Sequence, residues 1–160
     1  LGNKGRTEAG DVQVMSAGSG VTHSEFNASK TEAVKLFQIW LYPDKENVKP
    51  RYDQLSLKVS DRKNKLQTIV SPETEKNGLW IHQQAWLSMG NFDKDKNTTY
   101  KVKKEGNGIY AMIVKGEFEI NNNVLHERDA IGMWNTSEIN LIAKSEGAEI
   151  LLMDIPMQLN

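Results

Sequence analysis

The sequence contains no cysteine, three histidines and four prolines among its 160 residues. Without cysteine, the chain forms no disulfide bonds and offers no thiolate ligands to a metal, and this composition is typical of a cytoplasmic protein. The three histidines are His23, His82 and His126, and no two of them form a His-x-His pair. Any metal site in this chain therefore depends on isolated histidines combined with carboxylates.

The sequence also lacks a long hydrophobic run and an excess of charge of either sign. No apolar segment approaches the ~18 residues that a membrane-spanning helix needs, and nothing resembles a secretory signal. The chain has 20 basic and 21 acidic residues, so it shows no electrostatic footprint of a nucleic-acid-binding protein. We therefore expect neither a membrane nor a nucleic acid as a partner.

The sequence does contain many short apolar runs, separated by residues that favour turns. No helical period extends beyond two turns, and this pattern predicts an all-β barrel or sandwich. One segment, Tyr110 to Ile120, is predicted to be a hairpin bent at Lys115 and Gly116. The expected strands cover residues 11–15, 35–42, 54–59, 66–70, 79–89, 98–102, 108–120, 130–134, 139–143 and 149–155.

The segment at residues 35–42 is apolar on both faces, which is typical of a strand covered on both sides. A charged stretch bounded by Pro43 and Pro50 follows it, and such a stretch neither pairs as a central strand nor builds a core. The sequence therefore predicts a boundary between residues 1–43 and residues 44–160.

The segment around His23 is the best candidate for a functional site. Val12 and Val14 alternate with polar residues as in a strand with one buried face, and a small-residue hairpin at residues 16–20 follows. If a second strand comes next, His23 and Glu25 point to the same face. A neutral imidazole and a carboxylate form half of a site for iron, manganese, copper or zinc. The alternative is an ordinary strand-edge pair that makes a surface hydrogen bond.

The run from Ala17 to Glu25, followed by Phe37-Gln38-Ile39-Trp40-Leu41, resembles the pirin family of two-domain cupins, or bicupins. The resemblance implies that His23 and Glu25 are the second pair of an iron site made of three histidines and one glutamate. The family's first pair, in a His-Pro-His segment, would precede Leu1. We therefore expect residues 1–43 to be the C-terminal part of a metal-type cupin. Residues 44–160 would be a complete cupin jelly-roll barrel without metal ligands.

The resemblance leaves three hypotheses about function. The first is a metal-dependent dioxygenase of the quercetin 2,3-dioxygenase type that acts on flavonols, with Glu25 both as a metal ligand and as the catalytic base. In that case iron or another divalent transition metal belongs to the full-length parent, and this chain alone is inactive and holds no metal. The second is a non-enzymatic binding or regulatory module of the pirin type, and the third is a structural domain without activity.

The remaining candidates have mainly structural interpretations. We expect His82 to be a half-buried strand residue bonded to a neighbour, and His126 to be an exposed loop residue. The four tryptophans, Trp40, Trp80, Trp86 and Trp134, are expected to pack in the barrel core, with a pocket for a planar ligand as the alternative. Because strands at residues 11–15 and 35–42 would lack barrel partners, we expect a homodimer through these strands. The alternative is that they fold back on their own barrel.

Overall fold

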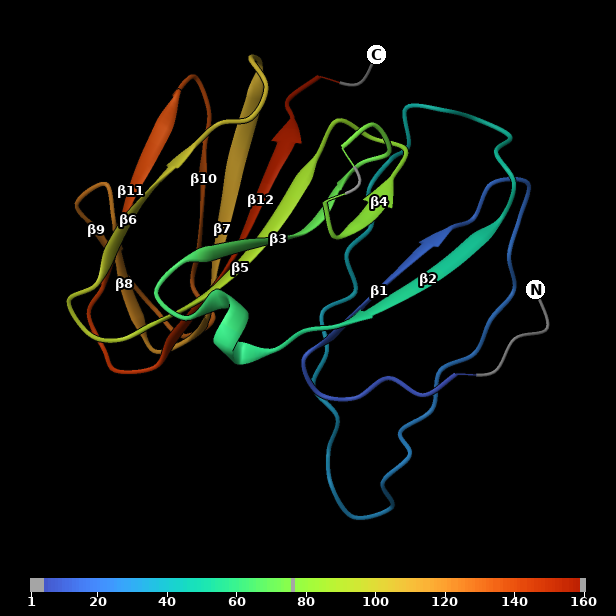
Figure 1. Ribbon diagram of the computed structural model, residues 1–160, viewed down its shortest axis with the longest axis horizontal. Coiled ribbons are helices and arrows are strands. Elements are labelled where there is room, and N and C mark those ends of the chain that lie inside the picture. The colour runs from blue at the N-terminus through green and yellow to red at the C-terminus, as the bar shows by residue number, and fades with distance from the viewer. Residues whose placement is uncertain (1–4, 76, 159–160) are drawn as a thin grey trace.

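The computed structural model describes residues 5–75 and 77–158, which form two facing β-sheets and a separate two-stranded ribbon (Figure 1). A short 3-10 helix, η1 (Val59–Arg62), lies between the ribbon and the sheets. The strands are β1 (Asp11–Ser16), β2 (Arg51–Ser56), β3 (Leu66–Pro72), β4 (Leu79–Ile81), β5 (Trp86–Phe92), β6 (Asn97–Lys101), β7 (Asn107–Lys115), β8 (Glu117–Ile120), β9 (Asn123–His126), β10 (Ala130–Met133), β11 (Glu138–Ala143) and β12 (Ala148–Pro156).

The two facing sheets are built almost entirely from antiparallel pairs. The six-stranded sheet has the order β10-β7-β12-β5-β3-β4, and the four-stranded sheet has the order β6-β11-β8-β9. Among the strands that the structure describes, only β3 and β4 pair in parallel. Strands β1 and β2 form the ribbon, which lies beside the outer face of the six-stranded sheet near β4 (Figure 1). The all-β architecture predicted from the sequence is therefore confirmed.

The main core fills the space between the two sheets, which we call the barrel interior. Strand β12 directs Ala148, Ile150 and Leu152 into it, as expected from the two-residue period of a strand. Phe92 and Phe118 meet edge to face there, with ring centroids 5.8 Å apart. This interior contains the largest fully buried apolar side chains of the described residues, so it supplies most of the hydrophobic stabilisation.

A second, thinner core lies between the ribbon and the outer face of the six-stranded sheet. The alternate residues of β12, Leu151 and Met153, face this side. Val12 and Val14 of β1 pack against them in the same cluster, as the predicted strand with one buried face requires. We call this layer the outer core. It attaches the N-terminal part of the chain to the barrel of the same chain.

One carboxylate, Asp154 of β12, is fully buried at the end of the barrel interior. Its Oδ2 accepts hydrogen bonds from the Tyr100 hydroxyl at 3.0 Å and the Lys103 backbone N–H at 2.7 Å, and its Oδ1 accepts one from Asn107 Nδ2 at 2.6 Å. Burial, together with the adjacent carboxylate, raises the pKa of Tyr100 above its ordinary value. A buried charge is tolerated here because three donors surround it.

The predicted bend at Gly116 is found, but the hairpin predicted for Tyr110 to Ile120 is wrong, because β7 and β8 do not pair and belong to different sheets. Strands β7 and β8 meet at Gly116, whose φ of 77° favours glycine. A Cβ at this position would lie 2.3 Å from Ser145 Oγ, which accepts a hydrogen bond from the Glu117 backbone N–H. The expected strand at residues 79–89 is instead two strands, β4 and β5, separated by a bend.

The prediction of a buried strand at residues 35–42 is wrong. No backbone–backbone hydrogen bond joins these residues to any other part of the chain that the structure describes. Leu36, Phe37 and Trp40 are exposed, and Leu41 alone of this segment contacts the outer core. An apolar sequence favours a strand only where a partner strand satisfies its backbone. None of the described strands pairs with this segment, and the Tyr42 carbonyl oxygen accepts a hydrogen bond from a side chain, Gln83 Nε2, at 2.7 Å.

The predicted boundary at residue 43 is not tested by these observations. Residues 43–47 are exposed, as expected of a linker, yet the Asp44 backbone N–H donates to the His82 carbonyl. The two strands of the ribbon come from opposite sides of the boundary. The division into residues 1–43 and 44–160 stays a prediction.

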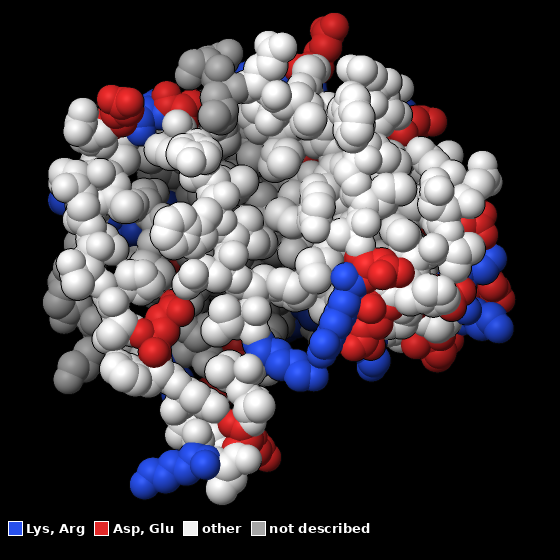
Figure 2. Space-filling model, turned by 180° about the vertical axis from the view of Figure 1, so that it is seen from behind, with Lys and Arg blue, Asp and Glu red and all other residues white. Residues whose placement is uncertain are grey.

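The surface of the molecule carries charges of both signs. In Figure 2, basic and acidic side chains lie close together just below the centre of the face shown and along its margin, and uncharged residues cover most of the rest. Within the described residues, no helix is both long and apolar enough to cross a membrane.

Candidate functional site

The ribbon has one apolar and one polar face, and the polar face positions the candidate site. Val12 and Val14 face the outer core, so Asp11, Gln13 and Met15 face away from it. Gln13 pairs with Gln54 of β2 in the antiparallel register. The polar face therefore presents amide groups that can orient side chains from the segment after β1.

His23 and Glu25 lie side by side next to this polar face. His23 Nδ1 is 4.0 Å from Glu25 Oε1, and both side chains are partly exposed. Glu25 Oε1 also accepts a hydrogen bond from Gln13 Nε2 at 3.1 Å. The structure thus brings together the two residues predicted from the His-x-Glu spacing.

His23 and Glu25 are close together as predicted, but not because they lie on one strand. Residues 21–25 form no strand, and β1 pairs with β2 and not with the segment that follows the turn. The Gly20 backbone N–H donates to the Ala17 carbonyl, so residues 17–20 form a turn. The chain continues after this turn as an irregular segment without strand pairing. The hydrogen bond from Gln13, and not a neighbouring strand, therefore positions Glu25.

A chain of side-chain contacts extends from Glu25 across the ribbon. Tyr52 Oη lies 3.1 Å from Gln13 Oε1 and 2.7 Å from Gln54 Oε1, and Gln54 Nε2 donates to Asp11 Oδ2 at 2.7 Å. Hydrogen bonds from the Glu8 backbone N–H, and from Ser56 and Gln54, lower the pKa of Asp11. Sequence reasoning missed Gln13 and Tyr52, because the partner strand of β1 lies far away along the chain.

The donor atoms of His23 and Glu25 are suited to a divalent transition metal. Neighbouring ligands that share an ion at about 2.1 Å each have donor atoms about 3.0–3.4 Å apart. The observed separation of 4.0 Å is longer, so the two side chains would move slightly closer on binding an ion. In metal sites, carboxylate ligands are usually oriented by hydrogen bonds from residues that do not bind the metal. The hydrogen bond from Gln13 orients the Glu25 carboxylate in the same way. Among the described residues, no group of three or more potential ligands occurs. The pair fits half of a metal site.

The other two histidines lie elsewhere, and each also meets a glutamate. His82 Nδ1 is 3.3 Å from Glu73 Oε2 and its side chain is largely buried, but the residue lies just after β4 and not in a strand as predicted. His126 Nδ1 is 3.2 Å from Glu117 Oε2, and its side chain is exposed at the end of β9 and not in a loop. Only the pairing of β8 with β9, which places Glu117 opposite His126, could have indicated the second partner.

The expectation that the four tryptophans pack in the barrel core is wrong for three of them. Trp86 is buried, but Trp40 and Trp134 are exposed. Trp80 lies beneath the Arg51 guanidinium, 3.7 Å from the ring centroid, and contributes to attaching β2 to β4. The tryptophans therefore do not form a common aromatic pocket.

Two protein-family models and several known proteins match this chain. The model of the quercetinase C-terminal cupin domain matches residues 68–155, more than half of the chain, and the Pirin model matches residues 1–41. A quercetin 2,3-dioxygenase of Escherichia coli strain K12 is 34% identical over 98% of this chain and 65% of its own length. A putative quercetin 2,3-dioxygenase of Zymomonas mobilis is 38% identical over 96% of this chain and 64% of its own length.

A solved structure has the same fold. The crystal structure of the bacterial pirin YhhW from Escherichia coli in complex with nickel(II) superposes with a TM-score of 0.88 at 34% identity. The match covers 97% of this chain and 65% of that chain, so this chain spans about two thirds of the length of these relatives. The predicted cupin fold is confirmed. The chain belongs to the pirin family of cupin proteins.

Proposed function

We propose that this chain supplies His23 and Glu25 to the metal site of a pirin-type dioxygenase that acts on flavonols. The observation that carries the proposal is the proximity of the two side chains, 4.0 Å between Nδ1 and Oε1, beside Gln13. Relatives named as quercetin 2,3-dioxygenases support the substrate class. The nickel complex of a pirin supports a metal in the family, and iron or another divalent transition metal stays our prediction for the full-length parent.

The two residues have different roles in this proposal. His23 contributes a neutral nitrogen ligand, and Glu25 contributes a carboxylate that also accepts the proton of the flavonol hydroxyl group. The metal would supply Lewis-acid and redox chemistry to the bound substrate. Gln13 holds the Glu25 carboxylate in one orientation, because its amide donates to the oxygen that faces His23.

The proposal is tested by metal content and by bleaching of quercetin. We expect this chain alone to retain no iron or nickel after gel filtration, because two ligands hold an ion weakly. A chimaera that joins the unmatched third of the Escherichia coli relative to this chain is expected to retain about one equivalent and to bleach quercetin. His23→Ala in the chimaera removes the metal, whereas the control His126→Ala leaves it bound.

Two outcomes would change the assignment. If the His23→Ala chimaera still held a full equivalent of metal, His23 would not be a ligand. If the unmutated chimaera bound metal but left quercetin unchanged, the non-enzymatic regulatory module would replace the dioxygenase as our proposal.

Association of two chains is a further part of the proposal. The ribbon packs on its own barrel, but Phe37, Trp40 and the other apolar side chains near them stay exposed. Exposed apolar surface of this kind favours association. We expect a concentration-dependent homodimer in sedimentation equilibrium, and a monomer of 18.1 kDa at all micromolar concentrations would exclude it.

A further inference from the structure

The sequence contains two Asn-Gly dipeptides, Asn77-Gly78 and Asn107-Gly108. Asparagine is chemically labile, because the backbone nitrogen of the next residue can attack the side-chain amide. Glycine favours this attack, since it has no Cβ to shield its nitrogen and it restricts the backbone least. The two dipeptides are therefore equally susceptible by sequence, and only their surroundings in the fold distinguish them.

The fold protects Asn107 from this reaction. The residue is 5% exposed, and its Nδ2 donates to the Gln84 carbonyl at 3.1 Å and to Asp154 Oδ1 at 2.6 Å. Gly108 lies in β7, where it is paired with Ile155 of β12. Before the Asn107 side chain could turn towards the Gly108 nitrogen, both hydrogen bonds would have to break and β7 would have to open.

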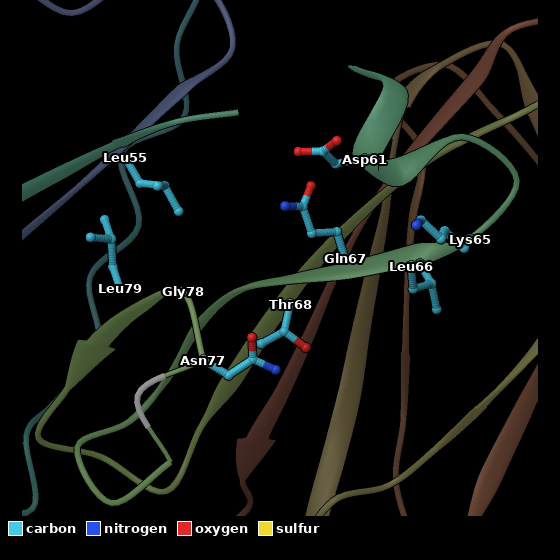
Figure 3. Close-up of a pocket in the computed structure, with 9 residues that line it drawn as sticks. All are labelled: Leu55, Asp61, Lys65, Leu66, Gln67, Thr68, Asn77, Gly78 and Leu79. Carbon is cyan, nitrogen blue, oxygen red and sulfur yellow. The ribbon is translucent and has the colours of Figure 1, made fainter. Parts of the chain in front are cut away.

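Asn77 has none of this protection. Asn77 and Gly78 are exposed in the turn between β3 and β4, where they line a cleft beside the ribbon (Figure 3). None of the described residues forms a hydrogen bond with the Asn77 side chain or with the Gly78 backbone N–H. The attacking nitrogen and the amide that it attacks are therefore both open to water.

The turn has little room for a longer backbone. A Cβ at Gly78 would lie 2.5 Å from the Ile69 carbonyl oxygen, so the chain here packs directly against β3. The Asn77 backbone N–H donates to Ser71 Oγ at 2.9 Å, which also holds the turn against this strand. The next residue, Leu79, begins β4 and belongs to the outer core. An added backbone atom at Asn77 would therefore displace β4.

We propose that Asn77 is a site of spontaneous deamidation and that its isoaspartate product loosens the attachment of β4. The Gly78 nitrogen bonds to Asn77 Cγ and loses its proton, and Asn77 Nδ2 leaves as ammonia. Water then opens the resulting five-membered succinimide ring at one of its two carbonyl groups. One opening gives aspartate, and the other gives isoaspartate, whose Cβ becomes part of the main chain. The proposal does not depend on the metal site at His23 and Glu25.

The test is incubation of the folded chain in mildly alkaline buffer, followed by mass spectrometry of its tryptic peptides against a sample taken before incubation. Trypsin cuts after lysine and arginine, so residues 77–94 and 105–115 carry the two asparagines in separate peptides. We expect the amide-to-acid change to be at least about tenfold faster at Asn77 than at Asn107, because Asn107 reacts only when β7 opens. In urea, where neither residue is protected, the two rates should become similar.

Asn77→Gln is the matched control, because glutamine would have to close a less favourable six-membered ring and should not react on this time scale. The isoaspartate form, isolated by ion-exchange chromatography, is expected to show at least about threefold faster hydrogen exchange at Leu79–Ile81, with β7 and β12 unchanged. The proposal is overturned if Asn77 reacts no faster than Asn107 in the folded chain. It is equally overturned if exchange at β4 is the same in the isoaspartate form and the unreacted chain.

Discussion

The barrel and the N-terminal region of this chain use the same residue types with opposite results. Phe118 in the barrel interior is fully buried, whereas Phe37 in the N-terminal region is 50% exposed. In the barrel, each apolar strand has hydrogen-bonded neighbours and faces a second sheet. Residues 35–42 have neither, so their hydrophobicity alone does not order them into a sheet.

The ribbon is intermediate between these two extremes. Its backbone is paired, and one of its faces covers the outer core, but neither of the described larger sheets covers the other face. That free face holds the polar contacts that position Glu25. The comparison indicates that stability decreases from the barrel interior to the ribbon and then to residues 35–42, and the following predictions test this order.

The largest effect is expected from Phe118→Ala. The substitution leaves a cavity in the barrel interior opposite Phe92, and such cavities cost about 3–5 kcal/mol. Urea denaturation followed by circular dichroism measures the loss in the free energy of unfolding. A loss below about 1 kcal/mol would mean that the barrel interior is not the main source of stability.

A smaller effect is expected from raising the pH. Because the folded chain keeps Tyr100 protonated, its contribution to stability is complete below the unfolded pKa of about 10 and decreases above it. The decrease is up to about 1.4 kcal/mol per pH unit. Urea midpoints of the wild type and Tyr100→Phe between pH 9 and 11 should therefore converge. Parallel curves would show that Tyr100 does not cause the decrease.

Val14→Ala is expected to cost about 1–2 kcal/mol, because it removes two buried carbon atoms from the outer core. Hydrogen exchange should show faster exchange of the β1 and β2 amides, with β7 and β12 unchanged. Equal acceleration in the ribbon and the barrel would mean that the two regions unfold as one unit.

The smallest effect is expected from Phe37→Ala, the matched control for Phe118→Ala. An exposed side chain away from the core contributes within about 0.5 kcal/mol. The measurement is made at low concentration, where the expected dimer dissociates. A loss similar to that of Phe118→Ala would show that residues 35–42 pack against something in solution.

Several elements of the fold follow from the sequence alone. The alternation of Val12 and Val14 with polar residues predicts β1 and its buried face correctly, because a period of two needs only local information. The bend at Gly116 is predicted for the same reason. Both signals lie within a few residues of the structure that they determine.

Contacts between distant residues are not predictable in this way. The partner of β1 is β2, beyond the intervening residues 17–50, and no local pattern identifies it. For the same reason, the contact of Gln13 with Glu25 and that of His82 with Glu73 were missed. The His-x-Glu spacing correctly predicted that His23 and Glu25 lie close together. The turn at residues 17–20 and the hydrogen bond from the Gln13 amide position them, and not a strand.

The pairing of β1 with β2 has a consequence for the order of folding. Closing the loop formed by residues 17–50 costs more chain entropy than closing the tight β8–β9 hairpin, in which Ile120 lies opposite Asn123. We therefore expect the barrel to form first and the ribbon to dock afterwards. Pulse-labelled hydrogen exchange during refolding would detect late protection of the β1 amides. The contact of Tyr52 with Gln13, the residue that positions Glu25, would then form only at the end of folding.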